Sequence, residues 1–219
     1  MKFDWLVIWR NLDAFIDGAK LTILLAVATM AIAVPGGILL AMMRISGIRV
    51  LSVIATAFIE LFRNVPLILV IYMAYYVLPV MSGLSASPLV TGLIALSLNV
   101  SAYNGETFRA GIASIRKGQS EAAFALGMSP WQTFRIVVLP QAVKRVLPIL
   151  ASTWISLFKD TSLVSVISVG ELSYVSTRVR AQSFRVLEVL TAMAAIYWVL
   201  GYPQAKLVDW INKRWGSAE

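Results

Sequence analysis

The most constraining feature of the sequence is the presence of long runs without a charged side chain. One run extends from Leu21 to Met43 and another from Asn64 to Gly105. A helix needs about 20 mostly apolar residues to cross a bilayer, so the first run is long enough. The second is too long for one span, and the Ser-, Gly- and Pro-rich stretch 81–88 divides it as a loop. With 59% hydrophobic and 14% charged residues, the chain is expected to cross a membrane several times.

The formal net charge of +8 indicates that the cytoplasmic loops of a membrane protein carry the excess of Lys and Arg. No nucleic-acid partner is expected. The sequence contains no His and no Cys. Ser-His-Asp and Cys-His catalysis are therefore excluded, and the commonest metal ligands are missing. We expect no catalytic residues and no metal. An intramembrane enzyme is a remote alternative.

The uncharged runs predict an all-α membrane protein with five transmembrane helices. Pro35-Gly36-Gly37 is expected to weaken or kink the first helix, and Lys159-Asp160-Thr161-Ser162 should interrupt the fourth. The distribution of Lys and Arg favours the N-terminus outside and the C-terminus in the cytoplasm. The expected spans are approximately 21–43, 52–80, 88–110, 146–170 and 189–205.

Three parts of the chain are distinguished. Residues 1–17 carry Trp5, Trp9, Leu12 and Ile16 at helical spacing, which predicts an N-terminal amphipathic segment lying in the membrane interface. Packing on the rest of the protein is the alternative for this stretch. Residues 18–212 form the transmembrane domain, and 213–219 form a C-terminal tail.

Within the transmembrane domain, residues 110–145 form a polar and basic cytoplasmic loop. Residues 121–126 are mostly good helix formers, and Gly127 is a natural helix stop. Ser129, Pro130 and Gln132 then match a capping box with Pro at the first helical position. The pattern predicts a helix, a sharp turn and a second helix that together form a compact projection. A loop that only packs on the membrane face is the alternative.

The same loop resembles the EAA loop of ATP-binding cassette importer permeases. It has Glu121-Ala122-Ala123, then Gly127, then Val137-Val138-Leu139-Pro140 at the family spacing. Three further stretches resemble the polar amino acid permease subfamily. They are Glu60-Leu61-Phe62-Arg63-Asn64-Val65-Pro66-Leu67, Ala102-Tyr103-Asn104-Gly105-Glu106-Thr107-Phe108-Arg109 and Lys159-Asp160-Thr161-Ser162-Leu163.

The resemblance implies the permease subunit of a type I importer in a bacterial inner membrane. It implies two permeases, identical or homologous, an ABC ATPase dimer that takes up the coupling helix, and a periplasmic or surface amino acid-binding protein. ATP and Mg²⁺ would bind the partner ATPase and not this chain. An ATP-independent channel or secondary transporter is the competing hypothesis, since intramembrane acids also serve proton relays.

Two sets of residues are candidates for function. The ATPase-coupling set is Glu121, Ala122, Ala123, Gly127 and Pro140. A side chain at Gly127 is expected to spoil the turn and uncouple ATP hydrolysis from transport. The substrate-pathway set consists of polar residues expected at membrane depth, where charge is costly. These are Glu60, Arg63, Asn64, Asn104, Glu106 and Asp160.

Within the pathway set, Arg63 suits a carboxylate, and an acid would suit an ammonium group. Pro66 should free the carbonyl of Phe62. The alternative is that Glu60–Arg63 and Glu106–Arg109 are structural salt bridges at i, i+3 spacing.

Overall fold

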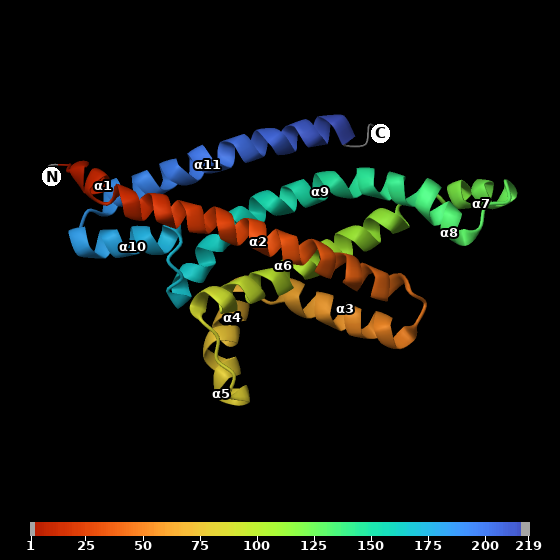
Figure 1. Cartoon of the computed structure of the whole chain (residues 1–219), viewed down its shortest axis with the longest axis horizontal. Coiled ribbons are helices and arrows are strands. Elements are labelled where there is room, and N and C mark those ends of the chain that lie inside the picture. Colours follow the sequence, from red (N-terminus) through yellow and green to blue (C-terminus); the bar gives the residue numbers. More distant parts are fainter. Residues whose placement is uncertain (1–2, 216–219) are drawn as a thin grey trace.

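The computed structural model describes residues 3–215, and all regular secondary structure in that range is helical. Four long helices run along the molecule (Figure 1). Shorter elements connect them or follow them in the chain. The long helices are α2 (Leu12–Ile45), α6 (Pro88–Ala113), α9 (Leu139–Asp160) and α11 (Val186–Trp215). The shorter elements are α1 (Leu6–Arg10), α3 (Arg49–Asn64), α4 (Leu67–Tyr72), η1 (Met73–Val77), α5 (Leu78–Ser82), α7 (Lys117–Ala125), α8 (Pro130–Gln132), η2 (Thr133–Val138), η3 (Thr161–Ile167) and α10 (Leu172–Ser183).

Three helical segments are long and apolar enough to cross a membrane. They are Leu12–Ile45, Pro130–Ile167 and Val186–Trp215. A fourth candidate is the pair Arg49–Asn64 and Leu67–Ser82, whose two halves are bent by 107°. The stretch expected as the second span, 52–80, is thus divided into two helices, because the chain turns sharply at Val65–Pro66. α6 is absent from these candidates although it is long, because polar residues such as Asn99, Ser101 and Asn104 lower its hydropathy.

The pair α2 and α6 forms the most extensive helix contact of the molecule. α2 continues through Pro35 as one helix, so the expected weak point does not break it. The adjacent glycines serve close packing instead. A Cβ atom on Gly36 would lie 2.5 Å from Ser101 Oγ, and one on Gly37 would lie 2.6 Å from Asn104 Cβ. No larger side chain fits there without moving α6 away from α2.

Two groups of buried side chains hold the fold together. The central one joins α2, α4, α6, α9 and η3 through residues such as Leu25, Ile71, Leu96, Leu157 and Val164. The second joins α1, the start of α2, α10 and α11. Many large apolar side chains on the outer faces are exposed, as expected of helices that meet lipid.

The buried carboxylate of Glu171 links α10 to the rest of this second group. It caps α10 by accepting hydrogen bonds from the backbone N–H groups of Ser173 and Tyr174, at 2.9 and 2.8 Å. It also accepts bonds from the hydroxyls of Thr22 on α2 and Tyr197 on α11. Burial raises the pKa of the Glu171 carboxyl, and these donors oppose that shift. The network fixes the chain that follows η3.

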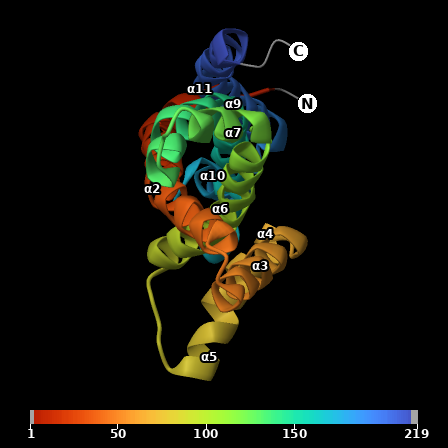
Figure 2. The same ribbon diagram turned by 90° about the vertical axis from the view of Figure 1, so that its right-hand side faces the viewer.

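In the segment α3 to α5, α3 packs against α2 and α6, and α4 belongs to the central core. α5 points away from the bundle, and an extended connection returns from it to α6 (Figure 2). Trp5, Trp9 and Ile16 at the N-terminus are exposed, whereas Val7 and Phe15 are buried against α10 and α11. Of the expected C-terminal tail, residues 216–219 lie outside the described range.

Candidate functional site

The break between α3 and α4 is produced by Pro66. Proline has no N–H group, so it cannot donate to the carbonyl of Phe62, and it forces Val65 into an extended conformation. The side chain of Asn99, on α6, donates to the freed Phe62 carbonyl at 2.8 Å. As expected, the Phe62 carbonyl lacks its usual bond within the helix. Its hydrogen bond comes instead from a side chain of a different helix.

A polar cavity of about 640 Å³ opens beside this break. Its wall comes from the α3–α4 junction, α6 and α9. We refer to it as the polar cavity, and its lining residues are Arg63, Asn64, Val65, Pro66, Leu67, Asn99, Val100, Tyr103, Ile149, Ser152, Thr153, Ser156, Leu157 and Asp160. Its volume lies in the range of small-molecule binding sites. Three of the six predicted pathway residues, Arg63, Asn64 and Asp160, meet here.

The polar cavity carries two opposite charges that do not neutralise each other. Arg63 lies at the end of α3 with its guanidinium carbon 5.6 Å from the centre of the Tyr103 ring. Asp160 is the last residue of α9 and lines the same cavity from that helix. Within residues 3–215, neither side chain forms an ion pair or a hydrogen bond. A guanidinium and a carboxylate held apart in one cavity match the carboxylate and ammonium groups of a zwitterion.

The other three predicted pathway residues lie elsewhere. Glu60 is exposed, and its carboxylate accepts a hydrogen bond from Asn64 Nδ2 at 2.9 Å rather than pairing with Arg63. Asn104 is fully buried between α6 and α2, where its Nδ2 atom faces the sulfur of Met30. None of these groups lines the polar cavity.

Glu106 belongs to an ion cluster that joins two helices. Its carboxylate accepts hydrogen bonds from Arg109, one turn further on α6, and from Arg44 at the end of α2. The Glu106–Arg109 pair is therefore a salt bridge within α6, as the alternative interpretation expected. Arg44 of α2 is a second partner of the same carboxylate. The Glu60–Arg63 salt bridge is not formed.

Several residues of the α9 wall were not singled out in the sequence, although they lie within the expected fourth span, 146–170. The expected interruption at 159–162 coincides with the end of α9 at Asp160, after which the chain continues as the 3-10 helix η3. The polar residues Ser152, Ser156 and Asp160 are spaced four apart and share one helix face. That spacing was the available signal for this wall of the cavity.

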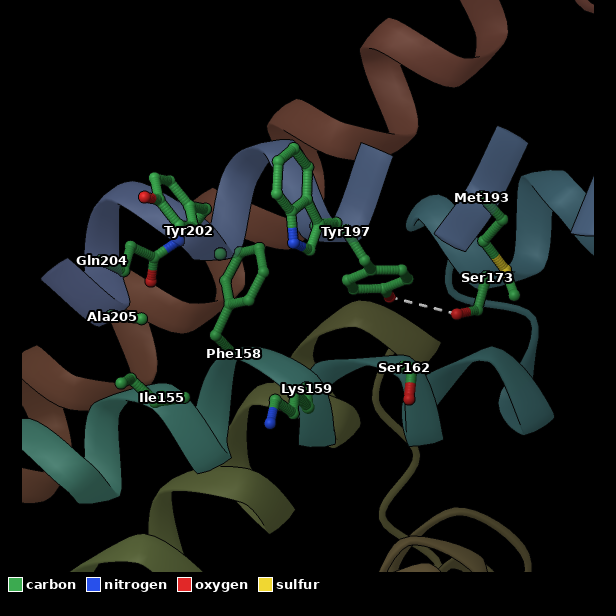
Figure 3. A pocket seen from close by; sticks show the side chains of 12 residues that line it. Ile155, Phe158, Lys159, Ser162, Ser173, Met193, Tyr197, Tyr202, Gln204 and Ala205 are labelled. Carbon is green, nitrogen blue, oxygen red and sulfur yellow. Dashed lines mark hydrogen bonds between the residues drawn. The ribbon is translucent and has the colours of Figure 1, made fainter. Parts of the chain in front are cut away.

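The neighbours Lys159 and Asp160 face different cavities. Asp160 lines the polar cavity, whereas Lys159 lines a largely apolar cavity of about 520 Å³ between α9 and α11. Figure 3 shows this second cavity, with Phe158 and Tyr197 facing each other and a hydrogen bond of 3.1 Å between Tyr197 and Ser173. The two charges of the polar interruption are thus separated.

The predicted helix–turn–helix projection is present at the other end of the molecule. We call α7, α8 and the turn between them the coupling hairpin (residues 117–132); it extends beyond the bundle (Figure 1). Gly127 has φ +79°, in the left-handed region that favours glycine. The N–H of Met128 donates to the carbonyl of Ala123, and that of Gly127 donates to Phe124. These two bonds form a Schellman motif.

The predicted capping box is also formed. Ser129 Oγ accepts from the N–H of Gln132, and the Gln132 side chain accepts from the N–H of Ser129 at 2.8 Å. Of the predicted coupling residues, Ala123 is buried, whereas Glu121, Ala122, Gly127 and Pro140 are exposed. The hairpin also exposes large apolar side chains, namely Phe124, Leu126 and Trp131.

One helical segment joins the coupling hairpin to the polar cavity. It runs from Pro130 to Ile167 through α8, η2, α9 and η3. The π-helical turn η2 ends two residues before Pro140, whose ring disfavours regular α-helical bonding of the preceding turn. The loop expected over 110–145 is therefore largely helical, because the capping box starts this segment at Pro130.

Comparisons with known proteins agree with this architecture. Residues 33–217 match the family described as binding-protein-dependent transport system inner membrane component. The chain is 37% identical to the glutamine transport system permease protein GlnP of Escherichia coli (strain K12) over 201 residues, which cover 91% of this chain and 92% of that protein. It is 33% identical to the glutamate/aspartate import permease protein GltK of Escherichia coli O6:H1 over 220 residues, covering 97% and 98%.

Solved structures show the same fold. A chain from the crystal structure of an amino acid ABC transporter with histidines superposes with a TM-score of 0.92 at 33% identity, covering 98% of this chain and 100% of that one. The MetNI methionine ABC transporter in an inward-facing conformation gives a TM-score of 0.66 at 19% identity over 93% and 97%, which supports the fold alone. The chain belongs to the family of inner membrane components of binding-protein-dependent transport systems.

Proposed function

We propose that this chain is the membrane-spanning subunit of an ATP-driven amino acid importer and forms the translocation pathway through the polar cavity. The observation that carries the proposal is that Arg63 of α3 and Asp160 of α9 line one cavity and form no ion pair within residues 3–215. An α-carboxylate suits the planar guanidinium of Arg63, and an α-ammonium suits Asp160. The names of GlnP and GltK support a polar amino acid such as glutamine, glutamate or aspartate.

Five membrane spans are part of the proposal. The four candidates found by length and hydropathy become five when α6 is included, since its polar residues Ser97, Asn99, Ser101 and Asn104 are buried and do not meet lipid. The N-terminus is placed outside and the C-terminus in the cytoplasm of a bacterial inner membrane, as the Lys and Arg bias favours. The exposed Trp5 and Trp9 support an N-terminal segment that lies in the membrane interface.

Coupling to ATP is assigned to the coupling hairpin. Its exposed apolar side chains suit insertion into a cleft of an ABC ATPase, with Glu121 pairing with a basic group there. Movement of the hairpin would reach the polar cavity through the segment Pro130–Ile167. The complete importer would contain two permeases, two ATPase subunits and an amino acid-binding protein, with ATP and Mg²⁺ on the ATPase.

An ATP-independent channel or secondary transporter is less compatible with these features. Such a protein has no use for a rigid cytoplasmic projection with apolar side chains on its surface. Family membership points in the same direction, because the family is named for transport that depends on a binding protein.

A reconstituted complex tests the proposal. The tagged chain is purified from its own cells in mild detergent, and a native mass spectrum is recorded. We expect two ATPase subunits and two permeases, whose masses show whether the pair is identical. Proteoliposomes containing this complex and ATP should take up radiolabelled glutamine or glutamate when the binding protein is added outside. A lone chain, or uptake that is unchanged without ATP, would contradict the proposal.

A further inference from the structure

A third cavity lies at the opposite end of α9 from Asp160. It has a volume of about 430 Å³ and is formed by one face of η2 and α9 together with the last residue described on α11. We call it the Arg135 groove. Its lining residues are Arg135, Leu139, Pro140, Val143, Lys144, Leu147 and Trp215.

Among the residues that the structure describes, the Arg135 groove is lined by two cations and by no acid. Within residues 3–215, neither Arg135 nor Lys144 forms an ion pair or a hydrogen bond, whereas the neighbouring Arg145 donates to the carbonyl of Ser114 at 2.6 Å. On α11, Lys206 and Asp209 approach each other at 4.0 Å, and neither lines the groove. The two cations of the groove are therefore available to an anion.

The apolar part of the Arg135 groove is ordered along the helix. Leu139, Val143 and Leu147 are spaced four residues apart, so they form a stripe along the helix, with Arg135 before its first residue and Lys144 next to Val143. Trp215 lines the groove from α11, and aromatic side chains are enriched at membrane interfaces. Two cations beside an apolar stripe that continues to Leu147 suit an anionic headgroup and an acyl chain.

We propose that the Arg135 groove binds an anionic phospholipid of the leaflet next to the coupling hairpin. The phosphodiester lies between Arg135 and Lys144, which are about 13 Å apart along a helix with a 1.5 Å rise per residue. The glycerol region contacts Trp215, and an acyl chain continues beyond Lys144 along Leu147. Basic pockets between membrane helices on the cytoplasmic side bind lipid headgroups in this way.

The site has a direct connection to the coupling hairpin. Arg135 lies three residues after Gln132, the capping residue of α8, and Pro140 belongs to the predicted coupling set. A lipid held here would brace the start of the segment that leads to the polar cavity. The proposed leaflet depends on the proposed topology, but binding itself does not depend on transport.

Native mass spectrometry of the complete complex tests the proposal. The complex is delipidated and titrated with palmitoyl-oleoyl phosphatidylglycerol, or with the zwitterionic phosphatidylcholine of the same chains. The wild type is expected to retain phosphatidylglycerol at concentrations where phosphatidylcholine is lost. The double variant R135Q/K144Q should retain at least fivefold less phosphatidylglycerol. The matched control R49Q/R116Q removes the same charge from exposed positions outside the groove and outside the coupling hairpin, and should bind as the wild type does.

The outcomes separate the possible occupants. Equal retention of phosphatidylglycerol by wild type and R135Q/K144Q would overturn the proposal. Loss of the ATPase subunits from the R135Q/K144Q complex, without a change in lipid retention, would make the groove a protein contact and would also overturn it. Retention by the wild type only after removal of residues 216–219 would show that the tail fills the groove. Thermal unfolding of the intact complex provides a second readout: phosphatidylglycerol should stabilise the wild type and the control, and not R135Q/K144Q.

Discussion

The helix break at Val65–Pro66 and the turn at Gly127 both interrupt helical structure, and they are stabilised in different ways. The break relies on a distant residue, because Asn99 of α6 satisfies the carbonyl that Pro66 leaves free. The turn is satisfied by its own neighbours, through a Schellman motif and a capping box. A break that needs the rest of the fold creates a cavity inside it, whereas a locally stable turn can project and meet a partner.

The largest effect is expected at Gly127. Gly127→Val places a β-branched residue at a positive φ, which costs about 1–2 kcal/mol and favours a different turn. Uptake in proteoliposomes should fall at least tenfold, while the protein remains in the membrane fraction. Gly118→Val is the control, because Gly118 also has open space around it but lies in α7 without a positive φ. Equal loss in both variants would refute a role of the turn geometry.

Arg63 tests the break as a binding site. Arg63→Ala removes the cation from the polar cavity, and we expect the KM for uptake to rise at least tenfold with little change in thermal stability. Arg63→Lys keeps the charge without the planar fork and should lie between the two. The control Arg49→Ala removes an exposed arginine at the other end of α3. An unchanged KM in Arg63→Ala would remove Arg63 from the pathway.

Asn99 tests whether the break depends on α6. Asn99→Ala leaves the Phe62 carbonyl without its donor, which should lower the free energy of unfolding by about 1–3 kcal/mol and reduce uptake severalfold. Ser97→Ala on the same helix is the matched control, because the buried Ser97 Oγ has no hydrogen-bond partner among residues 3–215. If both variants unfold at the same temperature, the Asn99 contact does not stabilise the break.

Glu106 tests whether a charged residue outside the polar cavity stabilises the fold or takes part in substrate binding. Glu106→Gln weakens the ion cluster with Arg44 and Arg109 and should destabilise the protein by about 2 kcal/mol. Because Glu106 does not line the polar cavity, the KM for uptake should stay within twofold of wild type. Thermal unfolding and uptake kinetics measured on the same preparation check both parts. A rise in KM without destabilisation would return Glu106 to the pathway.

The smallest effect is expected at the capping box. Ser129→Ala removes one cap bond and should destabilise the hairpin by about 1 kcal/mol, lowering uptake less than threefold. Ser129→Asn keeps a good cap and should behave as wild type. A loss as large as that of Gly127→Val would mean that Ser129 itself contacts the ATPase.

Local features were predictable from the sequence, and contacts between helices were not. Gly127, Ser129, Pro130 and Gln132 act within a few residues of one another, so their spacing was sufficient to predict the turn and the cap. The freed carbonyl of Phe62 followed from Pro66 alone. Its partner Asn99 did not, because the choice depends on how α3 and α6 meet.

The polar cavity shows the same limit. Charged residues within apolar stretches were selected as pathway candidates, and this criterion found Arg63 and Asp160. It also selected Glu106, which instead forms ion pairs with Arg44 and Arg109. The role of Gly36 and Gly37 was predicted wrongly for a related reason. They were expected to weaken the helix, whereas they allow α6 to pack closely against α2. The sequence of α2 alone does not reveal this contact.

That close approach has a consequence for how the pathway can open. With no side chain between them at Gly36 and Gly37, α2 and α6 cannot slide past each other without a clash, and Arg44 ties their ends together. We therefore expect α2 and α6 to move as one rigid pair. If the polar cavity is the translocation pathway, as proposed, alternation between an outward and an inward opening is expected to come from movement of α3–α5 and of the segment Pro130–Ile167 relative to this pair.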